Sequence, residues 1–141
     1  MSLPNVYFER IPQYKYRTTQ DTALALPELL GLGLETLARY DNEFLALNGS
    51  TMQLLVRAGY AWDGASGPTL DTDDTMLASL VHDALYQLIR LGVLPTSARK
   101  PADKILYRIG RAKGMHWIRV GAWYVALRLF GYPAARGQAR V

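Results

Sequence analysis

The chain has 141 residues, half of them hydrophobic, which suits one ordinary hydrophobic core and is too little for two comfortable domains. It contains no cysteine, so disulfides, thiolate metal sites and cysteine nucleophiles are excluded. The net charge of +4 is uneven, because the chain after Ser97 carries ten basic residues and one acid, Asp103. We expect residues 1–141 to form a single domain with a basic C-terminal part that suits a polyanion or an acidic loop of the same chain.

The first residues, MSLPNVYFERIPQY, lack the basic start, apolar run and cleavage site of a secretory signal, so no signal peptide is expected. The most apolar stretch, residues 117–130, is interrupted by two arginines and is shorter than the ~20 residues that span a bilayer. No transmembrane segment is therefore predicted.

Residues 1–60 are predicted to be mainly strands. Apolar runs flank Asn48-Gly49, and an Asn-Gly between such runs is the strongest short-range signal of a hairpin. Asp41-Asn42 supplies an earlier turn, so we expect an antiparallel meander of three strands, over residues 36–39, 43–47 and 51–59. The segment at 22–33, TALALPELLGLG, fits strand or helix equally well.

Residues 74–131 are predicted to form three helices. The first runs from about Asp74 to Gly92, with apolar residues at helical spacing, and the second runs from Pro101 to Gly114. The third, at 116–133, is apolar nearly all round. Since the strands precede the helices, we expect an α+β fold in which an N-terminal antiparallel β meander packs against three C-terminal helices.

A long connection, from about Tyr60 to Asp73, joins the last strand to the first helix. Loops of that length without their own secondary structure are uncommon and often functional. Asp63 lies within it and is a candidate site residue, although Asp63-Gly64 is also a common turn pair. Ser66 is a second candidate, although the surroundings of a nucleophile elbow are missing.

The first helix carries His82, Asp83 and Tyr86 on the side opposite its apolar stripe. His82 and Tyr86 are four residues apart and point the same way, so we expect both to face water or to line a cleft. A lone histidine on a helix is more often a surface or structural residue, and a tyrosine more often packs than reacts. Asp103 follows in the first turn of the next helix, where the helix dipole alone favours an acid.

Four of these side chains together offer the oxygen and nitrogen ligands that suit Zn, Mn or Mg: Asp63, His82, Asp83 and Asp103. Several carboxylates around one histidine repel each other unless a cation or shared hydrogen bonds relieve them. The set therefore predicts either a divalent-metal site or a tight internal network in which a carboxylate accepts from His82.

Three separated motifs resemble the DUF1353 family, small bacteriophage and prophage proteins without an established function. They are DGAS with a following proline at 63–68, HDALY at 82–86, and Ala102-Asp103 at a helix start, and the resemblance covers roughly residues 55–131. It implies a phage-encoded protein in the cytoplasm of the bacterial host or in the virion. It also implies that Asp63, Ser66, His82, Asp83, Tyr86 and Asp103 belong to one site.

Two functions remain open. One is a metal-dependent hydrolase of a phosphoester or of cell-wall material, in which His82, Asp83, Asp63 and Asp103 hold the ion and activate its water while Ser66 and Tyr86 assist. Basic side chains that share one face of the second helix would hold an anionic substrate, unless that face is simply solvated: Lys100, Lys104, Arg108 and Arg111.

The alternative is a non-enzymatic virion or assembly protein, or a binder of a host factor, in which the His-Asp cluster is structural. The aromatic third helix, with Trp117, Trp123, Tyr124 and Phe130, would then bind a phage or host protein, unless it is buried in the core. Nucleic-acid binding is the weakest reading, because the basic residues form no recognised motif and are spread over two helices and a tail.

Overall fold

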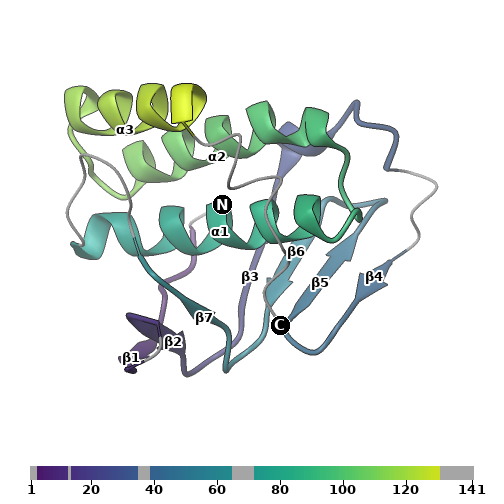
Figure 1. Cartoon of the computed structure of the whole chain (residues 1–141), viewed down its shortest axis with the longest axis horizontal. Helices are drawn as coiled ribbons and strands as arrows, with labels where there is room; N and C mark the ends of the chain where they lie inside the picture. The colour runs from purple at the N-terminus through teal and green to yellow at the C-terminus, as the bar shows by residue number, and fades with distance from the viewer. Residues whose placement is uncertain (1–2, 13, 35–38, 65–71, 131–141) are drawn as a thin grey trace. The chain divides into compact units, whose positions relative to one another are not determined.

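A computed structural model describes residues 3–12, 14–34, 39–64 and 72–130 of the chain. The chain divides into two compact units, Met1–Gly64 and Ala65–Val141. Strands and one short 3-10 helix make up the described part of the first unit, and helices make up that of the second (Figure 1). This order confirms the predicted α+β class.

The larger sheet of the N-terminal unit is antiparallel, in the order β3-β6-β5-β4. Leu47 pairs with Leu54, and Leu45 pairs with Val56, so that these four buried side chains share one face of the sheet. Because β4, β5 and β6 are consecutive, an antiparallel meander is confirmed, with shorter second and third strands than predicted and with Asp41 in β4 rather than in a turn. The strands are β3 (Thr22–Ala25), β4 (Tyr40–Asp41), β5 (Leu45–Asn48) and β6 (Gln53–Val56). The predicted strand at 36–39 falls mainly on residues outside the described part.

A four-residue loop joins β5 to β6 where the hairpin was predicted. The side-chain oxygen of Asn48 accepts hydrogen bonds from the backbone N–H groups of Ser50 and Thr51, at 2.8 and 3.1 Å. Met52 closes the loop in the left-handed region, at φ 57°, and its side chain is buried. The ambiguous segment at 22–33 resolves into β3 followed by a 3-10 helix, Pro27–Leu29.

A smaller antiparallel sheet in the same unit has the order β1-β2-β7. Its strands are β1 (Phe8–Arg10), β2 (Tyr16–Thr18) and β7 (Ala61–Trp62). Tyr16 lies opposite Trp62, with ring centroids 5.5 Å apart, and Phe8 packs edge-on against Tyr16 at 5.2 Å. The expectation of a connection without secondary structure from Tyr60 to Asp73 is therefore wrong at its start, because β7 lies within it.

The C-terminal unit contains three α-helices, and α2 lies between α1 and α3 (Figure 1). They are α1 (Met76–Arg90), α2 (Arg99–Ala112) and α3 (Trp117–Phe130). Short 3-10 turns precede the first two, at Asp73–Thr75 and Thr96–Ala98. Gly92, at φ 77°, ends α1 as predicted. All three predicted helices are confirmed, with boundaries that differ by a few residues.

A close approach of chain segments fixes α3 on α2. A Cβ atom at Gly110 of α2 would lie 2.8 Å from the side chain of Val120 and 2.9 Å from that of Met115. Val120 and Trp123 are the buried residues of α3, and Tyr124 packs edge-on against Tyr107 of α2 at 6.2 Å. Glycine at 110 is thus what allows the α3 side of the unit to pack this closely.

Candidate functional site

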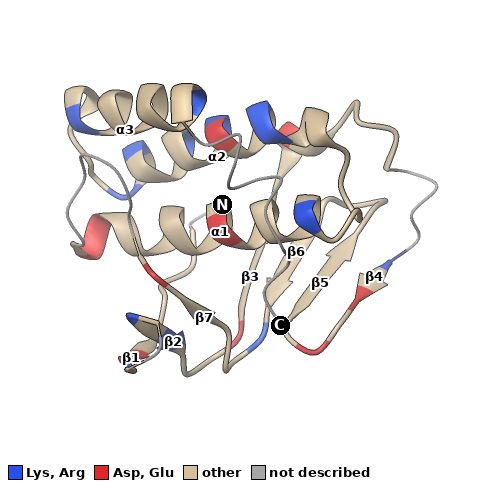
Figure 2. Ribbon diagram, in the orientation of Figure 1, with Lys and Arg blue, Asp and Glu red and all other residues tan. Residues whose placement is uncertain are grey.

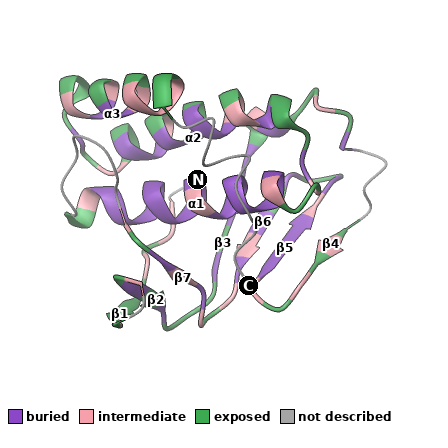
Figure 3. Ribbon diagram, in the orientation of Figure 1, coloured by how far each residue is buried: buried purple, intermediate pink, exposed green. Residues whose placement is uncertain are grey.

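His82 and Tyr86 lie one turn apart on α1, with ring centroids 4.1 Å apart. The expectation that this side of α1 faces water is wrong, because His82 is 8% exposed and Tyr86 is 3% exposed. Figure 3 shows burial along almost the whole of α1. His82 and Tyr86 can be buried because α2 places a carboxylate against them. Both side chains hydrogen-bond to this carboxylate, so their polar groups keep a partner away from water.

That carboxylate belongs to Asp103, which is fully buried in α2. Its Oδ1 accepts a hydrogen bond from Tyr86 Oη at 2.6 Å and lies 2.7 Å from His82 Nε2. Its Oδ2 accepts from Arg128 of α3 at 2.9 Å. One side chain therefore links all three helices, and both of its oxygens are engaged by protein groups.

Burial and hydrogen bonding act in opposite directions on Asp103. Burial alone would raise the pKa of this carboxyl, but hydrogen bonds from His82, Tyr86 and Arg128 outweigh it and hold the pKa of Asp103 below its usual value. The carboxylate is therefore ionised at neutral pH and acts only as an acceptor, so Nε2 of His82 carries the proton of their shared hydrogen bond.

Burial also raises the pKa of the Tyr86 hydroxyl, and the neighbouring Asp103 charge raises it further. Tyr86 is thus a neutral donor throughout the physiological range. This favours a role as a fixed hydrogen-bond donor over a role as a nucleophile or base.

A second arginine joins α2 to the end of α3. Arg99 donates through Nη2 to the backbone carbonyls of Leu127 and Arg128, at 2.8 and 2.6 Å. Both carbonyls belong to the last turn of α3, where helix carbonyls lack intrahelical partners and a cation is favoured. Arg99 also hydrogen-bonds to Tyr86, so it touches the same cluster.

Sequence reasoning missed both Arg99 and Arg128. Arg128 did leave a signal, since it interrupts an otherwise apolar helix and a charge in that setting calls for a partner. The partner is 25 residues away in sequence, and helical periodicity does not identify it. We name the five side chains of this network, His82, Tyr86, Arg99, Asp103 and Arg128, the buried cluster.

The buried cluster does not include the other predicted site residues. Asp63 belongs to the N-terminal unit, where it is exposed directly after β7, and the following Gly64 has φ 78°, as the turn interpretation requires. Ser66 lies outside the described residues. Asp83 is half-buried on α1, next to the buried cluster. On α2, three of the predicted anion-binding side chains are exposed, Lys100, Lys104 and Arg111, and Arg108 is half-buried.

The described ranges contain no group of three or more His, Cys, Asp or Glu side chains that could hold a metal ion. Three donors of the same chain already use Asp103, whose carboxylate has about four acceptor positions. The guanidinium of Arg128 also compensates the carboxylate charge. A cation at Asp103 would compete with the Arg128 guanidinium for the same carboxylate, and the role of Asp103 as a metal ligand stays a prediction.

A second polar link joins the start of α1 to α3. Nη1 of Arg119 lies 3.2 Å from both carboxylate oxygens of Asp74, and its Nη2 donates to Thr72 Oγ1 at 2.9 Å. Thr72 caps the 3-10 turn through a reciprocal pair of bonds with Thr75. Asp74, which lies in the 3-10 turn before α1, therefore ties this turn to α3.

The apolar surface of α3 is only partly buried. Trp117, Ile118, Val125, Leu129 and Phe130 are each 53–76% exposed, and Figures 2 and 3 show α3 as a largely uncharged helix with much of its length exposed. The interpretation of α3 as a buried core helix is therefore wrong for this side. The expected interaction surface keeps Trp117 and Phe130 but loses Trp123, which is buried.

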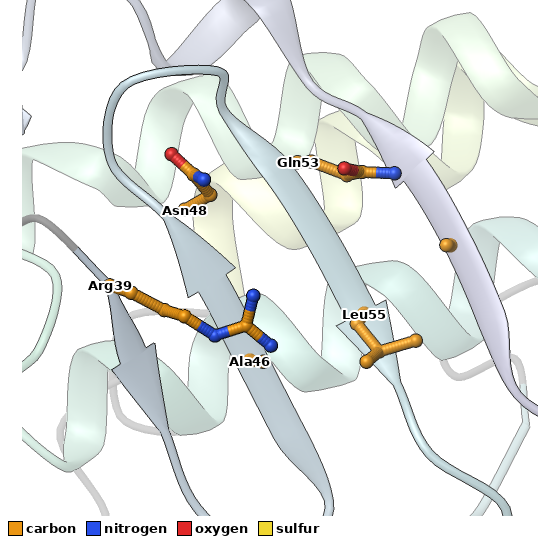
Figure 4. Close-up of a pocket in the computed structure, with 6 residues that line it drawn as sticks. Arg39, Ala46, Asn48, Gln53 and Leu55 are labelled. Carbon is orange, nitrogen blue, oxygen red and sulfur yellow. The ribbon is translucent and has the colours of Figure 1, made fainter.

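A shallow hollow lies on the larger sheet of the N-terminal unit, on the face opposite Leu45, Leu47, Leu54 and Val56. Arg39, Asn48 and Gln53 supply its polar groups, and Leu55 also lines it (Figure 4). The side chain of Arg39 also hydrogen-bonds to Asp41. None of the predicted site residues lines this hollow.

Among the described residues, no helix combines the length and apolar character needed to cross a membrane. The resemblance to the DUF1353 family rests on three short motifs, and one of them, at 63–68, lies mostly outside the described residues. The chain matches no protein-family model, no curated protein and no solved structure, so membership of that family stays a prediction.

Proposed function

We propose that the chain is a non-enzymatic component that works by binding a protein, and that the buried cluster is a structural link between its three helices. The observation that carries the proposal is that groups of the same chain engage both oxygens of the buried Asp103. Its Oδ1 is shared by His82 and Tyr86 and its Oδ2 by Arg128, all at 2.6–2.9 Å. A phage virion or assembly protein, or a binder of a host factor, remains the predicted setting.

The burial of the carboxylate supports the same conclusion. Removing one partner of a buried ion pair leaves an uncompensated group, which costs more than the pair itself contributes. Asp103 is fully enclosed and Arg128 is about one-third exposed. The cluster therefore serves to hold α1, α2 and α3 in one arrangement, and that arrangement leaves the apolar side of α3 exposed to a partner.

Calorimetry with Zn²⁺, Mn²⁺ and Mg²⁺ tests this proposal together with unfolding in urea. We expect no binding of these ions, and we expect Asp103→Asn to be strongly destabilised. His82→Gln keeps a donor near the position of Nε2 and should lose less stability than His82→Ala. Metal binding that disappears in both His82→Ala and Asp63→Ala, but persists in Lys104→Ala, would contradict the structural role.

The metal-dependent hydrolase is the second candidate, and the orientation of His82 is the observation that favours it. Asp103 holds Nε2, which leaves Nδ1 as the ring nitrogen able to accept a proton or bind an ion, as in carboxylate–histidine–metal arrangements. In this version Asp103 orients His82 and is not a ligand, while Asp83 supplies an oxygen. The exposed bases of α2 would hold the anionic substrate.

Hydrolysis of a generic phosphodiester in the presence of Mn²⁺ or Zn²⁺ tests the second candidate. It predicts a rate that is lost in His82→Ala and falls in Asp83→Ala. A double change of Lys100 and Lys104 to Ala should raise KM with little change in kcat. A rate that is the same in wild type and in His82→Ala would exclude it.

A further inference from the structure

The exposed side of α3 carries a regular seam. Four exposed residues follow one another at spacings of four, three and four positions: Ile118, Ala122, Val125 and Leu129. This alternation is the spacing of the a and d positions of a coiled coil, which place apolar side chains in line along one face of a helix. We call these four residues the outer seam.

The surroundings of the outer seam are also apolar. Gly121 and Ala126 lie beside it and Trp117 and Phe130 lie at its two ends, where a shallow groove follows the helix. The two charged residues of α3, Arg119 and Arg128, bind Asp74 and Asp103 of the same chain. No charge on α3 itself therefore opposes a second apolar helix placed on this face.

The size of this surface is that of an interface. A Trp or Phe side chain carries about 150–250 Å² of surface, so five large apolar side chains, each more than half exposed, present on the order of 600 Å². That is the upper end of the largest apolar patch on a typical monomer, about 300–600 Å². It approaches the ~800 Å² that each partner contributes to a stable complex.

We propose that the partner of this face is a second copy of the chain, and that two α3 helices pair antiparallel about a two-fold axis through their outer seams. An antiparallel pair places Ile118 opposite Leu129 of the second copy and Ala122 opposite Val125 of the second copy. The small Ala122 then packs against the larger Val125, and Ile118 packs against Leu129, which is similar in size. Parallel pairing would instead set Ala122 against Ala122 of the second copy and leave a gap.

Two further features favour this arrangement. The small residues Gly121 and Ala122 near the middle of the helix let the two backbones approach closely, as packing of helix ridges into grooves requires. Antiparallel helices also place opposite dipole ends together. The inference rests on the proposed function, since it names the partner of a protein-binding surface.

Sedimentation analysis of the full chain tests the pairing, over about three decades of concentration up to hundreds of micromolar. We expect a monomer–dimer equilibrium in the wild type. Val125→Glu should raise the dimer dissociation constant at least about tenfold, because it buries a charge at the centre of the seam. Leu91→Glu, the same kind of change at an exposed position at the end of α1, is the matched control and should leave the constant unchanged.

Gly121→Leu is a second variant that separates pairing from folding. A Cβ atom at Gly121 meets nothing within 4 Å, so the start of the new side chain has open space. It should keep or raise the unfolding midpoint while weakening the dimer at least about tenfold, because it holds the two helices apart.

Cross-linking tests the antiparallel register, because the chain has no cysteine of its own. Ile118→Cys and Leu129→Cys should form a disulfide when the two variants are mixed, and neither should cross-link alone. Cross-linking of either variant with itself would overturn the antiparallel arrangement.

A chain that stays monomeric at every concentration, or a dimer unaffected by Val125→Glu and Gly121→Leu, would overturn the pairing. So would a monomer that binds anionic vesicles through the same residues, since the face would then serve lipid. None of these results would decide whether the buried cluster is structural, because metal calorimetry tests that separately.

Discussion

Each unit of the chain pairs an aspartate with an arginine, and the two pairs differ mainly in their surroundings. In the N-terminal unit, Asp41 lies 2.6 Å from Arg57, and their side chains are 46% and 30% exposed. In the helical unit, Asp103 lies 2.9 Å from Arg128 and is completely buried. The distances are similar, but water solvates Asp41 and does not reach Asp103.

The pKa values show the same contrast. The hydrogen bond from Arg57 is the largest influence on Asp41 and lowers the pKa of this carboxyl. The largest influence on Asp103 is burial, which acts in the opposite direction and is overcome only by three donors together. An exposed ion pair therefore adds little to the stability of a fold that forms without it. A buried carboxylate makes the fold depend on its partners.

Deleting each carboxylate is the most direct test of this contrast. We expect Asp103→Ala to lower the free energy of unfolding by about 3–5 kcal/mol, because Arg128, His82 and Tyr86 lose their common acceptor. Asp41→Ala is the control in the strand unit and should leave the urea midpoint nearly unchanged. Equal losses in the two variants, measured by circular dichroism, would refute the proposed difference between exposed and buried pairs.

The stability of the helical unit should also depend on side-chain size at Gly110, where α2 and α3 approach closely. Gly110→Ala should cost about 1–3 kcal/mol, because the added methyl would lie under 3 Å from the Val120 and Met115 side chains. Gly121→Ala has open space and should instead stabilise α3 by up to ~1 kcal/mol. Thermal unfolding of both variants separates them, and the same sign of change in both would be inconsistent with this packing.

Tyr86→Phe removes one donor from the buried cluster and should cost about 0.5–1.5 kcal/mol at neutral pH. Because the pKa of Tyr86 is raised in the fold, its hydroxyl does not affect the pH dependence of stability below the unfolded value of about 10. Above that value, stability is lost as pH rises toward the folded pKa. The variant should therefore lose less stability between neutral and alkaline pH than the wild type does.

The smallest effect is expected at the partly exposed link between Asp74 and Arg119. Arg119→Ala should cost no more than about 1 kcal/mol, because both side chains keep contact with water. The loss should shrink further in high salt. A salt-independent loss as large as that of Asp103→Ala would mean that this link resembles the buried one after all.

Local pattern accounts for most of what the sequence predicted correctly. Helical spacing located the first two helices, a long apolar run located the third, and Asn48-Gly49 located the hairpin, because each signal depends on residues near one another in sequence. The pattern failed for the polar side of α1. A helix with one apolar stripe is expected to show water its other side, but here Asp103 of α2 supplies polar partners for that side and encloses it.

The candidate site was predictable only in part for the same reason. His82, Tyr86 and Asp103 were expected to be near one another, and they are. Arg128 and Arg99 joined them through contacts between positions 13 to 29 residues apart in sequence, which no helical period encodes. The exposure of α3 was equally hidden, because a helix that is apolar all round gives no indication of which side it buries.

Because α3 is apolar all round, its two arginines determine which side of the helix is buried. Arg119 and Arg128 are nine positions apart, which at about 100° per residue sets them on opposite flanks of the strip formed by Val120 and Trp123. Hydrophobicity alone would let such a helix settle at several rotations about its axis. The two arginines each bind a different aspartate, on either side of this strip. Together these two ion pairs select one rotational setting of α3.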